Sequence, residues 1–510
     1  MSLRIVSTLL GGSALARGAI DGSADASWFV TRPSRPHEWK QRADLILRSL
    51  ITPAWLDTLR PAFNASGKAA ERLERAASGG IAVTAGQQPG LFGGPLYTWW
   101  KAISALTLAD KLEVVTGLPV VPVFWAATDD SDFAEASLTV VATNEGAERI
   151  QIDRAGEEGT PLAQMPLGDI AHAFEQLEAA AGSAPNGQIL EIVRRCYAQG
   201  HSVGGAYVEL LRTVLEPFGI AVLDAAHPAV RSAAIPLLRS AIERAVPIEE
   251  ALTERSRVLK AAGHSVQVKI VKGRTLVFAG QDGKRDRIRT SDGSAALSGD
   301  GQGSMGPNVL LRPIIERSIL PTVAYMGGPG EIAYFAQVSA VAVALDTPAP
   351  LIVPRWSGFV IEPRIEKILE RYSLTIEDLR DPHAVETRIA KDSLPSAVTS
   401  KLKELQGSAE TTVRELASGE GAELVSPSVL EGLQRNVSHR IERLERRLRA
   451  GVKRRGNDAL RDIAIARGAL FPFETPQERA LNIVPLIARY GEELISSVSN
   501  EARLHAETLA

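Results

Sequence analysis

The sequence predicts an α/β protein with a largely parallel sheet, helical insertions and a C-terminal antiparallel α-helical coiled coil. Three observations predict it. Residues 81–133 pass from an apolar run through a glycine-rich turn and a helical pattern into a second apolar run. Short apolar runs and helical patterns keep alternating up to residue 353, which is typical of layered α/β folds. From residue 365 the chain changes to long helical patterns with leucines at coiled-coil spacing.

Residues 81–133 form one predicted βαβ unit. Residues 81–85 are apolar and end at a run of Gly, Gln and Pro, which stops an extended chain. Apolar side chains then recur at helical spacing from residue 96 to residue 115. Residues 120–127 are apolar nearly throughout, as expected of a parallel strand that is buried on both faces.

Further strands and helices are predicted from apolar runs and from 3.6-residue patterns. The strands are expected at residues 220–223, 266–270, 276–279, 309–311, 322–326 and 351–353. The helices are expected at residues 39–50, 208–215, 228–245 and 332–344. Gly, Ser and Asp dominate residues 281–306, which predicts a mobile loop there.

The chain is long enough for more than one structural unit. Residues 1–75 are expected to be a lead-in that packs on the core. Residues 76–364 are the α/β core, with a helical insertion near 142–218 that suits a cover over the site. Residues 365–460 form the predicted coiled-coil domain, and residues 461–510 return onto the core.

The coiled coil is predicted from two leucine-bearing seams with steps of three and four. The seams are Leu402, Leu405, Ala409, Val413 and Leu416, and Leu430, Leu433, Val437, Ile441, Leu444 and Leu448. Antiparallel helices joined around residues 419–427 would pair them, and we expect this region to form a homodimer. The basic run at 440–455 contains Glu442 and Glu445, which favours a solvated helix face over a nucleic-acid surface.

The composition indicates a globular protein of the cytoplasm. Hydrophobic residues make up 45% and charged residues 23% of the 510, and a net charge of −3 exerts no general attraction on nucleic acid. No apolar run approaches the roughly 18 residues of a membrane span. The single cysteine, Cys196, excludes intrachain disulfides and multi-cysteine zinc sites. We expect a buried structural thiol, because Gly200 separates it from His201, the nearest candidate base.

The glycine-rich turn after residue 85 is the first candidate binding site. It joins a buried strand to a helix N-terminus, whose N–H groups and positive dipole end favour a phosphate or carboxylate. The alternative is that the glycines only allow tight packing, since the spacing matches no known phosphate loop. The candidate residues are Gly86, Gln87, Gln88, Gly90, Gly93, Gly94 and Tyr97.

An acidic turn follows the second strand, with Asp129, Asp130 and Asp132 within four positions. The carboxyl ends of parallel strands share one edge of the sheet, so this turn and the glycine turn should face the same space. Three close carboxylates call for a metal ion, a substrate ammonium or an arginine. In the alternative, one aspartate caps the next helix and another lies in solvent.

A second glycine-rich turn contains Gly328, Gly330 and Glu331, again between a strand and a helix. Glu331 lies in the first helical turn, where it either caps the helix or takes part in a site. Arg355 follows another strand. It could hold a ligand carboxylate or phosphate through two hydrogen bonds, or it could form a surface ion pair.

Five motifs in order resemble the bacillithiol biosynthesis cysteine-adding enzymes. They are GQQPGLFGGPLYT (86–98), PVFWAATDDSDF (122–133), PNVLLRPIIERSILPTVAYMGGPGEIAYFAQ (307–337), PLIVPRWSGFVIEPRIEKIL (350–369) and TPQERALNIVPL (475–486). The resemblance covers the chain from about residue 80 onward. It implies a Rossmann-like core with helical insertions, a dimeric coiled coil, and a ligase that adds cysteine to glucosaminyl-malate in the last step of bacillithiol biosynthesis. It also implies a site for ATP or another nucleotide.

In this interpretation the glycine turns hold anionic groups of substrate or nucleotide, and Arg355 holds a carboxylate. Asp129, Asp130 and Asp132 hold the glucosamine amino group or Mg²⁺, and one of them accepts the proton that nitrogen loses on attack. One departure stands out. The family reads Glu-Asp-His-Asp-Phe where this chain has Ser131 in place of the histidine. The alternative function is therefore a catalytically altered or inactive dimeric binding or scaffold protein on the same fold.

Overall fold

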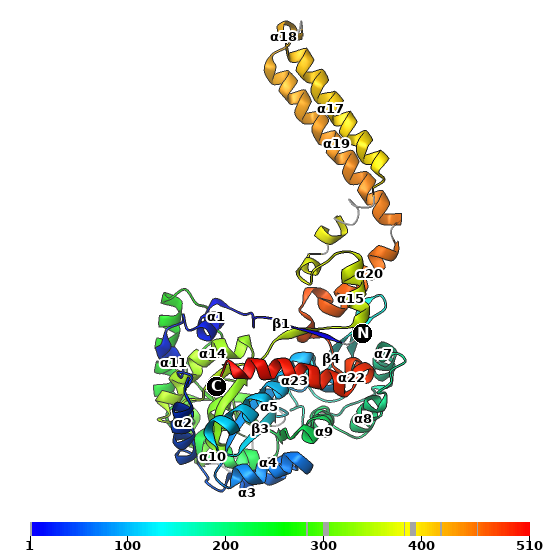
Figure 1. Ribbon diagram of the computed structural model, residues 1–510. Coiled ribbons are helices and arrows are strands. Elements are labelled where there is room, and N and C mark those ends of the chain that lie inside the picture. Colours follow the sequence, from blue (N-terminus) through cyan, green and yellow to red (C-terminus); the bar gives the residue numbers. More distant parts are fainter. Residues whose placement is uncertain are drawn as a thin grey trace.

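The computed structural model describes residues 3–281, 284–298, 305–381, 383–387, 394–418, 421–455 and 457–510. A globular part surrounds a central sheet, and a long helical hairpin projects away from it (Figure 1). The α/β core and the C-terminal helical hairpin both agree with the fold predicted from the sequence.

The central sheet is entirely parallel. Its strands are β2 (Ile81–Gln87), β3 (Val120–Ala126), β6 (Ala221–Asp224), β10 (Thr322–Gly327) and β11 (Ile352–Pro354). They lie in the order β11-β10-β2-β3-β6. The chain therefore starts in the middle, extends the sheet on one side, and then crosses back to extend it on the other. In such sheets the ligand crevice lies outside the carboxyl ends of the strands at the crossing, here β2 and β10.

Helices cover both faces of this sheet. One face carries α5 (Leu96–Thr116), α9 (Val203–Leu215) and α23 (Glu492–Glu507), and the other carries α4 (Gly67–Ala77), α10 (Pro228–Glu243) and α14 (Pro329–Ala344). Alternate residues of β2 enter different cores, with Val83 packing on the α5 side and Ala82 on the α10 side. Burial on both faces explains why the strand sequences are apolar without alternation.

Both chain ends pack on the core. Strand β1 (Arg4–Ser7) pairs antiparallel with β12 (Gly358–Ile361), and α23 runs along α5. The other helices are α1 (Ala14–Asp21), α2 (Pro36–Arg48), α3 (Trp55–Phe63), α6 (Phe133–Ala136), α7 (Ala171–Ala181), α8 (Gln188–Cys196), α11 (Ala245–Ala261), α12 (Gly293–Ser298), α13 (Arg312–Ile319), α15 (Pro363–Arg371), α20 (Asn457–Leu470), α21 (Gln477–Ala480) and α22 (Val484–Tyr490).

Two small sheets flank the core. Strands β4 (Leu138–Thr143) and β5 (Gly146–Gln151) form a hairpin, and β7 (Arg274–Gln281) lies between β8 (Lys284–Arg289) and β9 (Gly306–Pro307). The predicted loop at 281–306 is thus wrong for residues 284–298, which hold β8 and α12, while 282–283 and 299–304 lie outside the described residues.

Two predicted strands are wrong. Residues 266–270 form no strand because the Val268 N–H and carbonyl bond the side-chain amide of Gln337, at 3.0 and 2.8 Å, instead of a neighbouring strand. Residues 309–311 turn into α13 because the Asn308 side-chain oxygen accepts from the N–H groups of Leu310 and Leu311. In each case, hydrogen bonds to one side chain, Gln337 from a distant segment or Asn308 in the turn itself, take the place of the expected strand–strand hydrogen bonds.

The projecting hairpin consists of α17 (Ser396–Ser418), α18 (Gly421–Leu424) at the tip and α19 (Pro427–Arg455), with α17 packed along α19 (Figure 1). Three residues of the predicted seams, Val413, Leu430 and Ile441, are buried. Other seam leucines stay about half exposed, namely Leu405, Leu416, Leu433 and Leu444. The two helices thus cover only part of the apolar surface that they carry.

Candidate functional site

The two glycine turns predicted from the sequence lie at the crossing point of the sheet. The first follows β2 and leads into α5, and the second follows β10 and leads into α14. Because β2 and β10 are hydrogen-bonded neighbours, the turns lie at the same carboxyl edge. This is the place where the topology alone puts a ligand crevice.

The first turn is held closed by the protein itself. The Gly93 N–H donates to the Gly90 carbonyl at 3.1 Å and approaches the Tyr197 hydroxyl at 3.3 Å, and the Gly94 N–H donates to the Leu91 carbonyl. The Asn482 amide binds the carbonyls of Leu91 and Phe92 from the other side. The expected anion contacts of Gly93 and Gly94 are therefore corrected, since their N–H groups already have acceptors.

Glycine is required here for packing. Gly93 has φ +88°, and a Cβ at this position would lie 2.8 Å from the Trp99 ring and 3.2 Å from Leu210. A Cβ at Gly90 would lie 2.7 Å from the Cα of Gly94, and one at Gly86 would lie 3.1 Å from the Trp125 carbonyl oxygen. The packing alternative thus accounts for these three glycines.

The second turn is organised by Glu331. Its carboxylate accepts the Gly328 N–H and the Tyr325 hydroxyl, each at 2.7 Å, which caps α14 as the sequence suggested. It also pairs with Lys101 at 2.5 Å. Burial alone would raise the pKa of Glu331, but the charge and hydrogen bond of Lys101 outweigh burial and lower it. Gly330 is exposed and has open space around its Cα.

Lys101 links the two turns. This side chain is 2% exposed, and its ammonium donates to the Gly86 carbonyl at 2.8 Å and to the Gln87 side-chain oxygen at 3.0 Å. The Gln87 amide nitrogen in turn donates to the Tyr97 hydroxyl at 3.0 Å. A continuous chain of polar side chains therefore joins Tyr97, Gln87, Lys101 and Glu331 across the crossing point.

The three aspartates of the acidic turn do not converge on one point. Asp130 accepts from the backbone N–H groups of Ser131 and Asp132 and binds the Gln88 amide at 2.5 Å. Asp132 caps the short helix α6 through the Glu135 N–H at 3.1 Å, as the alternative reading of the turn proposed. Asp129 faces a separate pocket beside β6. The expected joint site for one cation is therefore corrected.

Arg355 makes the two-point contact expected of it, but with a protein carboxylate. It is 2% exposed and binds Glu478 at 2.6 and 2.9 Å. Its Nε lies 3.8 Å from the place where a Gly328 Cβ would stand, and its guanidinium lies 5.8 Å from the centre of the Tyr97 ring. Arg355 thus anchors the segment around Glu478 beside the second glycine turn.

Three pockets open around this edge. The turn pocket, of about 270 Å³, is lined by Gln87, Gln88, Gly90, Tyr97, Glu135, Arg149 and Arg479 among others. The N-terminal pocket, of about 540 Å³, is lined by Gly11, Gly12, Pro329, Arg380, Glu478 and Arg479 among others. Arg479 lines both, so these two pockets adjoin at its side chain.

The β6 pocket, of about 450 Å³, lies at the ends of β3 and β6. Apolar side chains such as Trp125 and Met305 form much of its wall, and its polar groups include Asp129, His227 and Arg231. His227 is the N-cap residue of α10, where its Nδ1 accepts the Ala229 N–H at 3.1 Å. The acidic turn separates this pocket from the turn pocket, with Asp129 on one side and Asp130 bound to Gln88 on the other.

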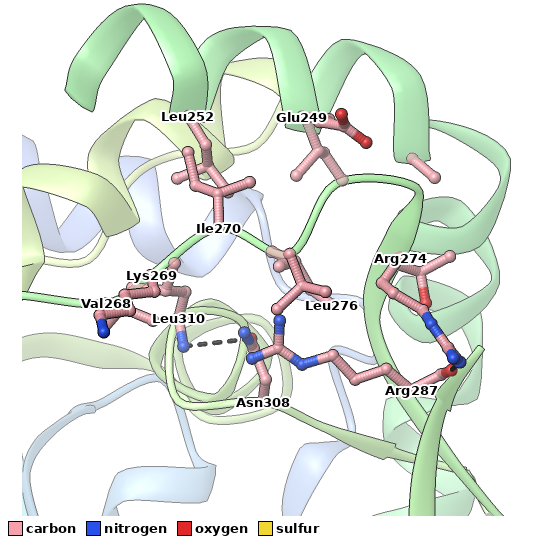
Figure 2. Close-up of a pocket in the computed structure, with 14 residues that line it drawn as sticks. Glu249, Leu252, Val268, Lys269, Ile270, Arg274, Leu276, Arg287, Asn308 and Leu310 are labelled. Atoms are coloured by element: carbon pink, nitrogen blue, oxygen red, sulfur yellow. Dashed lines mark hydrogen bonds between the residues drawn. The ribbon is translucent and has the colours of Figure 1, made fainter. Parts of the chain in front are cut away.

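A further hollow between α11 and β7 is far smaller. It offers about 10 Å³, which is room for about one water molecule. Figure 2 shows Asn308 and Arg287 reaching into it, with the Leu310 N–H bound to Asn308 at 3.1 Å. A substrate does not fit there.

Sequence reasoning missed Lys101, Glu135, Arg149, Glu478 and Arg479. Lys101 could have been noticed, since it is the only charged residue in the first half of the predicted helix. Glu478 and Arg479 lie in the motif at 475–486, but only the fold places them beside the glycine turns. Nothing in the sequence distinguishes Glu135 and Arg149 from ordinary surface residues. Cys196 is the buried thiol that was expected, and burial raises its pKa, which makes it a poor nucleophile.

Family models decide what kind of protein this is. The model of the bacillithiol biosynthesis BshC N-terminal Rossmann-like domain matches residues 22–302 and 301–356, and that of the C-terminal coiled-coil domain matches residues 358–508. The chain belongs to the bacillithiol biosynthesis BshC family. The resemblance seen in the five motifs is thereby confirmed, together with the Rossmann-like core and the coiled coil.

Known members of the family match over nearly the whole chain. A BshC protein of Solibacter usitatus is 32% identical over 502 residues, covering 95% of this chain and 93% of that protein. One of Koribacter versatilis is 32% identical over 467 residues, covering 88% and 86%. One of Bacillus licheniformis is 24% identical over 509 residues and covers 94% of each. These relatives are named for a cysteine ligase activity.

Two further features can be checked in the described part of the chain. Among those residues, no helix is both long and apolar enough to cross a membrane. The same residues hold no group of three or more His, Cys, Asp or Glu that could bind a metal ion.

Proposed function

We propose that this protein is a cysteine ligase that joins cysteine to glucosaminyl-malate through an amide bond in the last step of bacillithiol biosynthesis. Family membership over both domains supports this, together with the crevice at the crossing of β2 and β10. The single observation that carries the proposal is the match to family members along almost the entire chain.

The chemistry requires three parties next to one another. The cysteine carboxylate becomes activated, the glucosamine nitrogen attacks its carbon, the activating group leaves, and the nitrogen loses a proton. In the proposal the turn pocket lies between the other two: it adjoins the N-terminal pocket at Arg479, and the acidic turn stands between it and the β6 pocket. Glucosaminyl-malate is assigned to the β6 pocket, with Arg231 near its carboxylates.

Asp129 is proposed as the group that accepts the proton. Asp129 lines the β6 pocket, to which glucosaminyl-malate is assigned. A positioned general base contributes about 10²- to 10⁴-fold to a rate. The effect of replacing Asp129 can be compared directly with that of replacing Asp130 or Asp132, because all three aspartates lie within one turn.

A nucleotide, ATP or another, fits the N-terminal pocket better than the first glycine turn. The first turn has already bonded the N–H groups of Gly93 and Gly94. The N-terminal pocket offers about 540 Å³, the first turn of α14 at Pro329, and the guanidinium groups of Arg380 and Arg479. When bound, the nucleotide supplies the phosphoryl or adenylyl group that activates a carboxylate. Mg²⁺ would then take most of its ligands from phosphates and water.

The rival function is a catalytically altered or inactive dimeric binding protein on the same fold. Ser131 supports it, because a histidine here would titrate near neutral pH and serve as a base. Ser131 is half-buried in the acidic turn, and its N–H binds Asp130 at 2.7 Å. The ligase function requires that the native chain with Ser131 makes product, whereas the rival function predicts altered or absent activity.

A product assay with glucosaminyl-malate, cysteine and ATP, each omitted in turn, tests the proposal. We expect product only in the complete mixture, a 10²- to 10⁴-fold loss in Asp129→Asn, and little change in Ser131→Ala. An inactive native protein that gains activity in Ser131→His supports the rival. Product formation that survives in the asparagine variants of all three aspartates contradicts the assignment of the base.

We also propose that the protein is a homodimer through α17 and α19. Leu405, Leu416, Leu433 and Leu444 are 43–49% exposed in the single chain, which leaves seam surface for a second copy. Light scattering should give twice the chain mass at micromolar concentration. Replacing Leu433 and Leu444 by Glu should give monomers, while Glu442→Lys on the same helix should not; a native monomer contradicts the proposal.

A further inference from the structure

The orientation of the Gln87 amide follows from its neighbour. A lysine ammonium has only donors, so the group that Lys101 meets at 3.0 Å must be the oxygen of Gln87. The Gln87 NH₂ group must then face the Tyr97 hydroxyl, also at 3.0 Å. Lys101 itself cannot reorient freely, because it is buried and bound to the Gly86 carbonyl and to Glu331.

This orientation determines the role of Tyr97. Its oxygen accepts from Gln87, so its own O–H hydrogen must point to some other acceptor. Tyr97 lines the turn pocket, where a ligand atom can be that acceptor. Burial, followed by repulsion from Glu135 and Glu331, raises the pKa of Tyr97, so the hydroxyl keeps its proton at neutral pH. Tyr97 is therefore a donor prepared for an anion.

The turn pocket carries charges of both signs at separate points. Arg149 stacks on Phe473 at 4.0 Å, and Arg479 enters from α21. Glu135 lines the pocket from α6, and the described residues form no ion pair with it. Burial raises the pKa of Glu135, and the nearby Asp132 and Asp130 raise it further. A cation beside Glu135 would relieve this repulsion.

We propose that the turn pocket binds the α-amino acid substrate as a zwitterion, with its carboxylate on the Tyr97 hydroxyl and Arg479 and its ammonium on Glu135. This rests on the proposed ligase function and adds the place and orientation of cysteine. A volume of about 270 Å³ lies below the roughly 300–1,000 Å³ of pockets for drug-sized ligands, which suits a small amino acid.

The test separates the two ends of the ligand. Purified full-length protein is titrated by calorimetry with L-cysteine, with 3-mercaptopropionate, which lacks the ammonium, and with cysteamine, which lacks the carboxylate. Tyr97→Phe should weaken cysteine and mercaptopropionate by about 10- to 100-fold, as for a lost hydrogen bond to a charged group, and leave cysteamine unchanged. Glu135→Gln should weaken cysteine and cysteamine and leave mercaptopropionate unchanged.

Gln87→Glu tests the orientation argument without touching Tyr97. A glutamate accepts at both oxygens, so Tyr97 would donate to it and no longer to the ligand. We expect Gln87→Glu to weaken cysteine about as much as Tyr97→Phe, and the double variant to be no worse than either single one. Tyr207→Phe, at a buried tyrosine that lines none of these three pockets, is the control.

The outcomes distinguish a failure of the pocket assignment from a failure of the ligase function. If the native protein makes product but Tyr97→Phe, Gln87→Glu and Glu135→Gln all keep the native KM for cysteine, the pocket assignment is wrong and the ligase stands. If these variants raise the KM for glucosaminyl-malate alone, the pocket holds the malate end instead. If the native protein makes no product, but Tyr97→Phe and Glu135→Gln show the ligand-selective losses described above, the pocket assignment stands and the ligase function is wrong.

Discussion

The two glycine turns have the same local design, a buried strand that ends in glycines and opens a helix, yet they are built differently. In the first, Gly93 is required because the Trp99 ring and Leu210 fill the place of a side chain. In the second, Gly330 has open space, and order comes from the Glu331 carboxylate, which binds Gly328, Tyr325 and Lys101. One turn is shaped by packing and the other by a buried charge.

This difference shows that a glycine-rich turn does not by itself indicate a phosphate cradle. The first turn uses its N–H groups to close on itself and presents side chains, Gln87 and Tyr97, to the pocket. The second turn leaves the helix end near Pro329 facing the N-terminal pocket. Substitutions at five positions test the comparison, from the largest expected effect to the smallest.

The largest effect should come from Lys101→Met, which removes the link between the turns. It leaves Glu331 buried without its cation, and breaking a buried pair in this way costs about 3–5 kcal/mol of unfolding free energy. Lys111→Met is the matched control on the same helix, because its pair with Glu507 is partly exposed and should cost at most about 1 kcal/mol. Urea unfolding measures both, and equal losses would contradict the buried link.

The pH dependence of stability gives a second view of this pair. The folded-state pKa of Glu331 lies below its ordinary value of 4.5, so its contribution is present above that pH and is lost as pH falls. Glu331→Gln should therefore be less stable than the native protein at pH 7, with the gap shrinking below about pH 4.5. A gap that stays constant from pH 7 to well below pH 4.5 would mean that Glu331 does not titrate as described.

Gly93→Val should have the next largest effect. The side chain would overlap the Trp99 ring and would also need a positive φ, which together cost about 2–4 kcal/mol. The thermal midpoint measures this loss. If the variant is as stable as the native protein and only loses ligand affinity, the turn is a ligand cradle and not a packed joint.

Asn482→Ala should cost about 1–3 kcal/mol, because it removes the side-chain donor from the buried Phe92 carbonyl and leaves the Leu91 carbonyl with the Gly94 N–H alone. Asn482→Asp is the companion variant, since it keeps the size but replaces the amide donor with an acceptor. Both should be destabilised, with the aspartate at least as strongly affected. Stability at the native level in both would show that the first turn closes without this clamp.

Gly330→Ala should be the smallest change. The position is exposed, has a negative φ and lies in the first turn of α14, so alanine should alter stability by no more than about 1 kcal/mol, in the stabilising direction. Any loss should appear in ligand affinity instead, if a ligand approaches this backbone. A marked loss of stability would show that the second turn is also governed by packing.

Much of the fold followed from local patterns. Apolar runs without alternation predicted β2, β3 and β10, because strands buried on both faces need apolar residues at every position. Leucines at steps of three and four predicted α17 and α19. The failures were places where a distant side chain intervened, as at Val268, whose backbone binds Gln337 and not a strand.

The sequence by itself determined many of the elements, the two glycine turns between strand and helix, and the family motifs, since each depends on residues close together in the chain. Only the tertiary structure decided what those turns do. Lys101 meets Glu331, Arg355 meets Glu478, and Asn482 closes the first turn across 391 residues. Burial strengthens these polar contacts, because they lie in a medium of low dielectric constant. Which side chains are buried is set by how the whole chain packs.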